Sequence, residues 1–154
     1  MKLDGGAQFA KVLESLPFSA QRGVLNAILK KAGVPVKARM EELAPKGDPH
    51  PVNISDSIVV RSVSKIDDGS ELEARSLDDS EAAVAIGPTK DAFYAHFQEF
   101  GTAPHGNHPG NPPQPFARPA FDQTQDAVLR SIQDDIWARL RDAAGGRSTT
   151  GRNL

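Results

Sequence analysis

Residues 94–120 constrain the fold more than any other part of the sequence, because three kinds of sequence meet there. An aromatic, apolar segment ends at Gly101, a proline-rich loop follows, and Pro115-Phe116-Ala117-Arg118-Pro119-Ala120 then opens a helical pattern. Glycine permits backbone conformations that other residues avoid, so Gly101 predicts a turn with positive φ. The sequence therefore predicts an ordered segment, a long loop without regular structure and a helix, in that order.

The loop, residues 102–115, contains five prolines, two glycines and two asparagines, a composition that cannot supply a hydrophobic core. It is longer than the usual connection, and loops of this length are usually functional or disordered. Two interpretations stay open: a flexible surface excursion, and an arm that orders on a neighbouring protein. A proline-rich arm has less entropy to lose on binding, which favours the arm once a partner is present.

Apolar residues at helical spacing predict an N-terminal helical half over about residues 7–45. The first helix covers residues 7–15 and ends before Pro17. The second follows Ser19, and its apolar stripe is Val24, Leu25, Ile28, Leu29 and Ala32. Gly33-Val34-Pro35 should bend the helix or divide it in two, since proline removes a donor and clashes with the preceding turn. The pattern then resumes up to Ala44-Pro45.

β-Branched runs predict a small, mainly antiparallel sheet over about residues 54–101. Residues 58–65 read as a strand with one wet face, ended by a turn at 67–69. A second strand is predicted at 82–86 and a short one at 71–75. Residues 92–100 are ambiguous, because their phenylalanines match a helix while Tyr94, His96 and Gln98 alternate as in a strand.

The last element, over about residues 119–143, is the clearest by periodicity. Its apolar residues recur at three- and four-residue steps: Phe121, Val128, Leu129, Ile132, Ile136 and Leu140. Pro119 suits a first helical turn. We therefore predict an α+β fold, with N-terminal helices, the small sheet and a long C-terminal helix packed on it, as one domain over residues 1–144. Residues 145–154 have almost nothing to bury and should form a flexible tail.

Composition limits the classes of function. A net charge of -2 and a pI near 6.1 give no overall electrostatic drive toward nucleic acid. The chain has no cysteine, which excludes disulfides and thiolate chemistry and fits folding in a reducing cytoplasm. The first residues lack the apolar core of a signal peptide, and no run approaches the roughly 20 apolar residues of a membrane span. We therefore expect a soluble protein without a membrane partner.

Polar residues near Gly101 offer two candidate chemistries. Glu99 lacks the base, second acid or metal partner of a catalytic carboxylate, so we expect it to accept hydrogen bonds from nearby backbone or, preferably, to pair with Arg118. His96, His105 and His108 could bind zinc or iron with Glu99 in a small metal-dependent enzyme, since His105 and His108 are closely spaced. That spacing lies in a loop and not on a rigid helix, so solvated histidines or a subunit contact are favoured.

No other motif indicates catalysis. Gly101, Gly106 and Gly110 are interleaved with prolines and lack the lysine of a phosphate loop, and no serine lies in a nucleophile elbow. Trp137 lies near the apolar stripe of the last helix and is interpreted as a core or interface residue. We therefore predict no catalytic residue, no metal and no cofactor.

Several short motifs occur in an order that resembles one protein family. They are Ala44-Pro45, Ile86-Gly87, Tyr94, Glu99-Phe100-Gly101-Thr102 and Pro115-Phe116-Ala117-Arg118-Pro119-Ala120. Over roughly residues 20–143 this order resembles the head-tail joining (neck, or tail-completion) proteins of long-tailed bacteriophages, minor tail components such as the lambda tail-completion protein. The family often has a Thr-Gly-x-Leu-Arg-x-Ser run after the Ala-Pro, and Val52-Asn53-Ile54-Ser55-Asp56-Ser57-Ile58 keeps only its tail.

The resemblance implies a virion structural protein and not an enzyme. Such proteins form rings of identical subunits, six by the symmetry of the tail, that complete the tail end and join it to the DNA-filled head. DNA passes through the channel without sequence-specific binding. The implied partners are other copies of the chain and adjacent head-completion or connector, tail terminator or tail tube proteins. The implied location is the virion, at the neck or tail end, after assembly in the host bacterial cytoplasm. A tail terminator that caps the tail tube is the alternative within phage biology.

The resemblance also carries expectations for particular residues. It favours an extended conformation for residues 92–100, paired with the preceding strand. Interfaces and not a reacting group carry the function of such a ring, so the candidate site is an oligomer or neck interface. Its candidate residues are Tyr94, Glu99, Phe100, Gly101, Thr102, His105, His108, Pro115, Phe116, Arg118 and Trp137.

Overall fold

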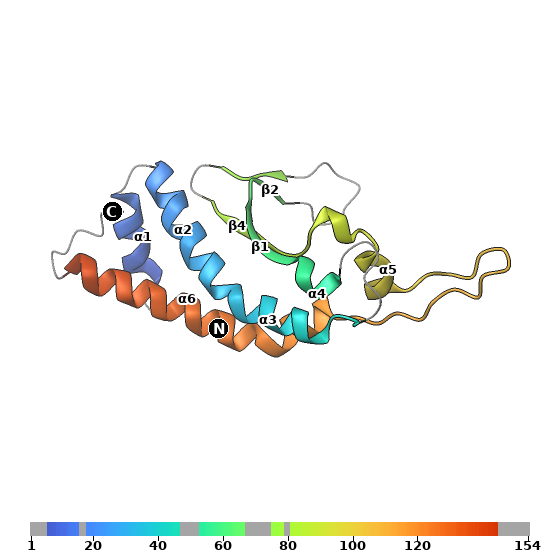
Figure 1. Ribbon diagram of the computed structural model, residues 1–154. Helices are drawn as coiled ribbons and strands as arrows, with labels where there is room; N and C mark the ends of the chain where they lie inside the picture. Colours follow the sequence, from blue (N-terminus) through green and yellow to red (C-terminus); the bar gives the residue numbers. More distant parts are fainter. Residues whose placement is uncertain (1–5, 16–17, 47–52, 67–74, 79–80, 145–154) are drawn as a thin grey trace.

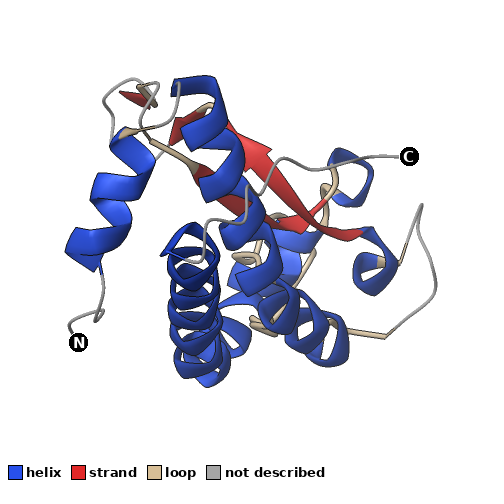
Figure 2. Cartoon of the chain, turned by 90° about the vertical axis from the view of Figure 1, so that its left-hand side faces the viewer, coloured by secondary structure: helices blue, strands red, loops and turns tan. Residues whose placement is uncertain are grey.

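The protein is seen here as a computed structural model that describes residues 6–15, 18–46, 53–66, 75–78 and 81–144 (Figure 1). Its elements, in chain order, are α1 (Gly6–Glu14), α2 (Phe18–Ala32), α3 (Val34–Leu43), α4 (Ile54–Ser57), β1 (Ile58–Val63), β2 (Lys65–Ile66), β3 (Arg75–Ser76), β4 (Ala83–Pro88), the 3-10 turn η1 (Lys90–Ala92), α5 (Ala95–Phe100) and α6 (Ala117–Ala144). The long helix α6 lies along α1, α2 and α3, and the strands pack on α2 and α3 (Figures 1 and 2). The fold class is α+β, as the sequence predicts.

Glycine and proline divide the N-terminal helical half as predicted. Helix α2 ends at Ala32, and Gly33 continues with a helical backbone before α3 begins at Val34. Pro35 falls in the first turn of α3, where its missing N–H interrupts no helical hydrogen bond. The chain therefore makes two helices in series, and α1 covers the first predicted helix almost residue for residue.

The main sheet has two antiparallel strands, β1 and β4, with Ile58 opposite Pro88 and Val63 opposite Ala83. These strands confirm the two stronger strand predictions. β2 and β3 form a second short antiparallel pair, and β3 overlaps the predicted strand at 71–75 by one residue. The rest of that strand and the predicted turn at 67–69 lie outside the described residues, as does the predicted tail at 145–154.

Two apolar clusters hold the layers together. The larger cluster joins α3, α4, β1, α5 and the start of α6, and its buried members are Val36, Met40, Ala44, Ile54, Ile58, Ala95, Phe116 and Ala120. The second joins α1, α2 and the far half of α6 through Phe9, Ile28 and Ile136. Between them, Lys31 of α2 pairs with Asp135 of α6 at 2.5 Å, and Arg39 Nε of α3 donates to Gln123 Oε1 of α6 at 2.7 Å. The long helix therefore ties the two clusters into one body.

Residues 92–100 correct the expectation of an extended segment. Pro88 ends β4, η1 follows, and residues 95–100 form the short helix α5. The buried residues are Ala92 and Ala95, each no more than 2% exposed and three positions apart, which is helical spacing. The alternation of Tyr94, His96 and Gln98 therefore does not correspond to an inner and an outer face of a strand.

The loop after α5 folds back on itself as a hairpin arm, whereas the sequence left open whether this loop is a flexible excursion or an arm. We use the name arm for residues 102–111, which project from the body beyond α5 (Figure 1). Thr102 pairs with Asn111, and His105 exchanges two backbone hydrogen bonds of 3.0 Å with His108. Gly106 and Asn107 form the turn between the histidines, with positive φ at glycine alone, as in a two-residue hairpin turn of type II′.

Prolines explain why the arm has isolated pairs instead of a continuous ladder. Pro104 and Pro109 lie opposite each other between the two paired positions, and neither has an N–H to donate. Gly110, with φ 80°, follows them and lies so close to Thr102 that an added Cβ would be 2.4 Å from the Thr102 carbonyl oxygen. The arm is therefore shaped by its glycines and prolines and not by packing against the body.

Gly101 makes the turn that opens the arm and confirms the predicted positive φ. Its φ of 72° and ψ of -178° fall in a region that is essentially limited to glycine. An added Cβ would lie 2.7 Å from the carbonyl oxygen of Asn111 and 2.9 Å from the nitrogen of Pro113. Both neighbours are backbone atoms, so no side-chain rotation relieves the overlap.

Gly101→Val should therefore lower the free energy of unfolding by about 2 to 3 kcal/mol, the sum of backbone strain and the displaced return strand of the arm. Denaturant unfolding followed by circular dichroism measures this change. Gly87→Val is the matched control, because a Cβ at Gly87 meets no atom within 4 Å and the residue lies in β4. The control should stay within about 1 kcal/mol of the parent protein. Equal stability of the two variants would contradict the role given to Gly101.

Candidate protein interaction site

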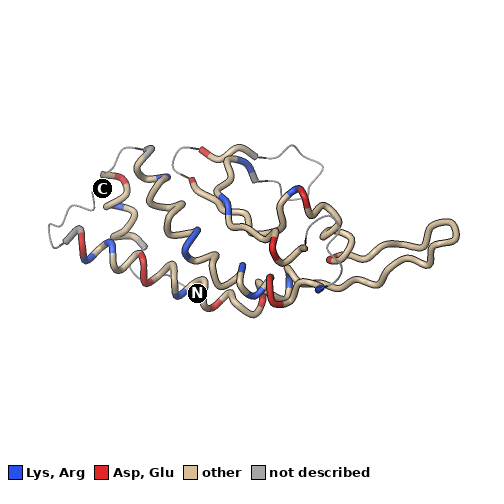
Figure 3. The backbone as a smooth tube through the Cα atoms, viewed as in Figure 1, with Lys and Arg blue, Asp and Glu red and all other residues tan. Residues whose placement is uncertain are grey.

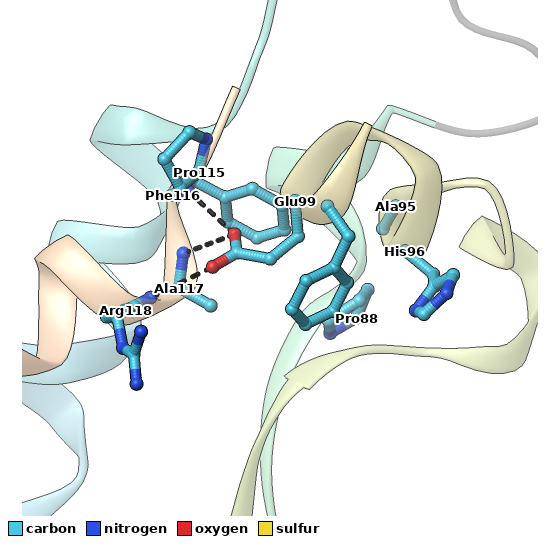
Figure 4. Close-up of a pocket in the computed structure, with 9 residues that line it drawn as sticks. Pro88, Ala95, His96, Glu99, Pro115, Phe116, Ala117 and Arg118 are labelled. Atoms are coloured by element: carbon cyan, nitrogen blue, oxygen red, sulfur yellow. Dashed lines mark hydrogen bonds between the residues drawn. The ribbon is translucent and has the colours of Figure 1, made fainter. Parts of the chain in front are cut away.

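An open groove of about 670 Å³ lies where α5 meets the first turn of α6 (Figure 4). We call it the α5–α6 groove. It is lined by Pro88, Ala95, His96, Glu99, Phe100, Pro115, Phe116, Ala117 and Arg118. Most of these residues are apolar, and the groove lies at the base of the arm because Phe100 immediately precedes the opening turn and Pro115 follows the return strand.

Glu99 joins the two sides of the groove through its carboxylate. Oε2 accepts hydrogen bonds from the backbone N–H groups of Phe116 and Ala117 at 2.7 and 2.9 Å, and Oε1 accepts one from Arg118 N–H at 3.2 Å (Figure 4). The first N–H groups of a helix have no partner within the helix, and the positive end of its dipole favours an anion. A carboxylate from α5 thus caps α6 from across the arm.

This geometry changes the expected contact between Glu99 and Arg118. The residues do meet, but the main-chain N–H of Arg118 makes the hydrogen bond and its guanidinium is not the donor. Ion pairs in the described part of the chain include Lys31–Asp135, Lys37–Glu41 and Arg39–Glu42. The Arg118 side chain is thus left at the rim of the groove, where residue 118 is exposed.

An aromatic stripe formed by α5 and by Phe93, just before the N-cap of that helix, continues the groove. Phe93 and Phe100 are 68% and 70% exposed, and Phe97 is 47% exposed. The ring of His96, a groove residue, lies 4.9 Å from that of Phe100 and 5.8 Å from that of Phe97, measured between centroids. Clustered exposed aromatic side chains make this surface a candidate interaction site. We call Phe93, Phe97 and Phe100 the α5 stripe.

The two arm histidines lie at the turn and not in the groove. They face each other across the hairpin, and His108 Nδ1 accepts a hydrogen bond from Gly110 N–H at 3.0 Å. Among the described residues, no three His, Asp or Glu side chains are placed to hold a metal ion together. The geometry therefore does not bring His96, His105, His108 and Glu99 into the site that a metal-dependent enzyme needs.

Other candidate residues fall into three places. Phe116 is 2% exposed and forms the floor of the groove as part of the larger core cluster, and Tyr94 packs partly buried against the same cluster. Gly101 and Thr102 form the base of the arm. Trp137 is 37% exposed on α6, about 30 Å along the helix from Arg118 at 1.5 Å per residue. The sequence candidates thus converge at the groove and the arm, with Trp137 apart.

Sequence reasoning missed Pro88, Phe93 and Phe97 as surface residues. Phe93, Phe97 and Phe100 recur at four- and three-residue steps, and this helical spacing was the available signal. In the extended conformation that the family resemblance favoured, these phenylalanines would lie on both faces of a strand. Nothing in the sequence marks Pro88 as a groove residue. It lines the groove only because the fold places the end of β4 beside it.

Charge is distributed unevenly over the molecule. Lysine, arginine, aspartate and glutamate alternate along the helices, whereas the arm has none of them (Figure 3). No helix among the described residues has the length and apolar content needed to cross a membrane.

Glu99→Ala should lower the free energy of unfolding by about 1 to 2 kcal/mol, because three N–H groups at the start of α6 lose their acceptor. Glu99→Gln keeps one acceptor oxygen and should lose less. Glu42→Ala removes a helix-surface carboxylate that is 64% exposed, and its loss should stay within about 0.5 kcal/mol. Thermal and denaturant unfolding compare the three variants. A similar loss for Glu99→Ala and Glu42→Ala would refute the cap.

The sequence matches the family model "Bacteriophage HK97-gp10, putative tail-component" over residues 7–101. The match runs from α1 through the last helix before the arm, which is more than half of the chain. No curated protein and no solved structure matches the chain.

The matched region includes Ala44-Pro45, Ile86-Gly87, Tyr94 and Glu99-Phe100-Gly101, so most of the motifs that indicated a phage protein fall within it. The family is consistent with a structural role in the phage tail or neck, with a place in the virion and with contacts to other virion proteins. The chain belongs to the HK97-gp10-like family of bacteriophage tail components.

Proposed function

We propose that this protein is a structural subunit of the phage neck, and that a ring of its copies completes the tail end and joins it to the DNA-filled head. The observation that carries the proposal is the pairing of an exposed hairpin arm with an exposed apolar groove at its base, in a chain of a phage tail-component family. Both features are interaction surfaces, which is what a joining protein needs.

The chemistry of the site also supports binding over catalysis. Glu99, the groove's carboxylate, is engaged by three backbone donors and caps a helix. The groove has no nucleophile beside a base, and its other ionisable side chains are His96 and Arg118. We propose that the protein contributes shape and contacts to the virion and carries out no chemical step.

Several finer features belong to the same proposal. Copies of the chain, six by the symmetry of the tail, surround a channel through which DNA passes without sequence-specific contacts. The net charge of -2 and the interspersed aspartates and arginines of α6 support a passage without tight DNA binding. The adjacent proteins are a head-completion or connector protein on one side and the tail terminator or tail tube on the other.

Electron microscopy of phage particles produced with this gene silenced tests the proposal directly. A neck protein predicts filled heads beside finished tails that are not joined. Tails of abnormal length would assign the chain to the tail terminator position instead. Normal, infectious particles would refute a structural role in the virion.

A shortened arm should separate joining from folding. Replacing residues 103–110 by Gly-Asn keeps the native turn residues between Thr102 and Asn111, which already pair. Thermal unfolding should change little, because the replaced residues lie almost wholly exposed beyond the core clusters. Complementation of the silenced phage should fall by roughly tenfold or more, the effect of losing a few kcal/mol of contact energy. Full complementation by a folded short-arm protein would show that joining does not require the arm.

A further inference from the structure

We propose that the arm of one copy of this chain docks in the α5–α6 groove of a second copy. The inference rests on the proposed function, because it names the contact by which copies of the joining protein associate. It assigns an occupant to the groove and a role to the prolines, neither of which follows from membership of the tail-component family.

The arm is built to be bound by something outside its own chain. Ala103, Pro104, His105, His108 and Pro109 are all exposed, and the arm extends away from the body (Figure 1). Backbone pairing and the conformations of Gly101, Gly106 and Gly110 fix its shape without a core. A preformed arm loses less entropy on binding than a flexible loop of the same length, so each contact contributes more to affinity.

The groove and the α5 stripe have the chemistry that binds a proline-bearing segment. Proline rings dock on aromatic surfaces, which recognise rigid segments with little entropy left to lose. Phe97, Phe100 and His96 provide aromatic surface beside the groove, and Phe116 provides its floor. The arm offers Pro104 and Pro109 opposite each other near its turn. A groove of about 670 Å³ has room for a segment of a few residues.

The charges of the two surfaces are compatible. The arm has no Lys, Arg, Asp or Glu, so its burial removes no permanent charge from water. The carboxylate of Glu99 is already satisfied by the start of α6 and needs no cation from the occupant. The guanidinium of Arg118 at the rim can donate to carbonyl oxygens of the arm, which has several beside its prolines. A strongly acidic or basic partner segment fits this pair of surfaces less well.

The position of the two surfaces makes the contact one between copies. The arm projects from the body beyond α5 (Figure 1), and none of its residues lines the groove, so its turn lies away from its own groove. Four to five extended residues carry the turn about 15 Å from Thr102, far enough to enter a neighbour. Arm and groove are different surfaces of one chain, and such a heterologous contact generates a ring when its rotation closes.

Two variants test the contact by complementation. The first is the short-arm protein with residues 103–110 replaced by Gly-Asn, which keeps the groove. The second is Phe100→Ser, which keeps the arm and alters a groove residue whose side chain is 70% exposed, so that folding is spared. Phe121→Ser is the matched control, since Phe121 is 53% exposed but does not line the groove. Circular dichroism verifies the fold of each variant.

Sedimentation velocity at increasing concentration should show self-association of the parent protein and of Phe121→Ser. Each of the two test variants alone should stay monomeric. Their mixture should form a one-to-one complex, because one supplies the arm and the other supplies the groove. Loss of association in Phe121→Ser, or no complex in the mixture of two folded variants, would overturn the proposal.

Cysteine crosslinking is a second test of the contact, and it also detects weak association. The chain has no cysteine, so each introduced thiol is unique. Under a mild added oxidant, Asn107→Cys at the arm turn, mixed with His96→Cys in the groove, should give a mixed disulfide dimer. Its yield should be about tenfold or more above that with Ala127→Cys on the exposed side of α6. Yields equal to this control would overturn the proposal, as would a dominant arm-to-arm dimer of Asn107→Cys. Unjoined heads and tails in the silenced phage would then still support the neck role, so failure of the contact is separable from failure of the function.

Discussion

The structure depends on one electrostatic contact, the carboxylate of Glu99 at the start of α6. A helix of 28 residues begins with N–H groups that have no partner of their own, and here the acceptor comes from seventeen residues earlier in the chain. The contact fixes α5 against α6 and brings Phe116 under the groove, where it completes the larger core cluster. The motif that contains Glu99 and the motif that contains Phe116 are separate in the sequence, and they therefore form the two sides of one contact in the structure.

The contact between Glu99 and the start of α6 also determines the role of the loop residues that lie between them in the chain. Gln114 N–H donates to the carbonyl oxygen of Gln98 at 2.7 Å, so both ends of the loop are held before the arm begins. Residues between such fixed ends contribute nothing to either core cluster and are free to be selected for contacts with other molecules. Proline and glycine suit that task, because they define a shape where no packing does. The stability of the body and the chemistry of the arm are thus largely separate properties of the chain.

The sequence predicts those helices and strands whose pattern of buried residues lies within a single element. α2, α3, β1, β4 and α6 follow from periodicity and from Gly33 and Pro35, and the positive φ of Gly101 follows from the residue type. What the sequence could not specify depends on distant partners. α5 is short, and its helical state is set by burial of Ala95 and by the bond from Glu99 to α6. The arm's pairing depends on which glycines and prolines fall opposite each other, and the groove exists only where β4, α5 and α6 meet.

In the proposed contact between copies, the same arrangement would let a small domain serve assembly without a large flat interface. An arm and a groove concentrate contact at a few aromatic and proline side chains, and such centres carry most of the energy of an interface. The arm begins beside Glu99, which binds the start of α6, and that helix continues to the second core cluster around Ile136. Neighbouring copies linked in this way would be connected helix to helix around a ring. A rigid helix rooted beside the contact, and not a flexible tether, then sets the angle between one copy and the next, and that angle decides whether the ring closes.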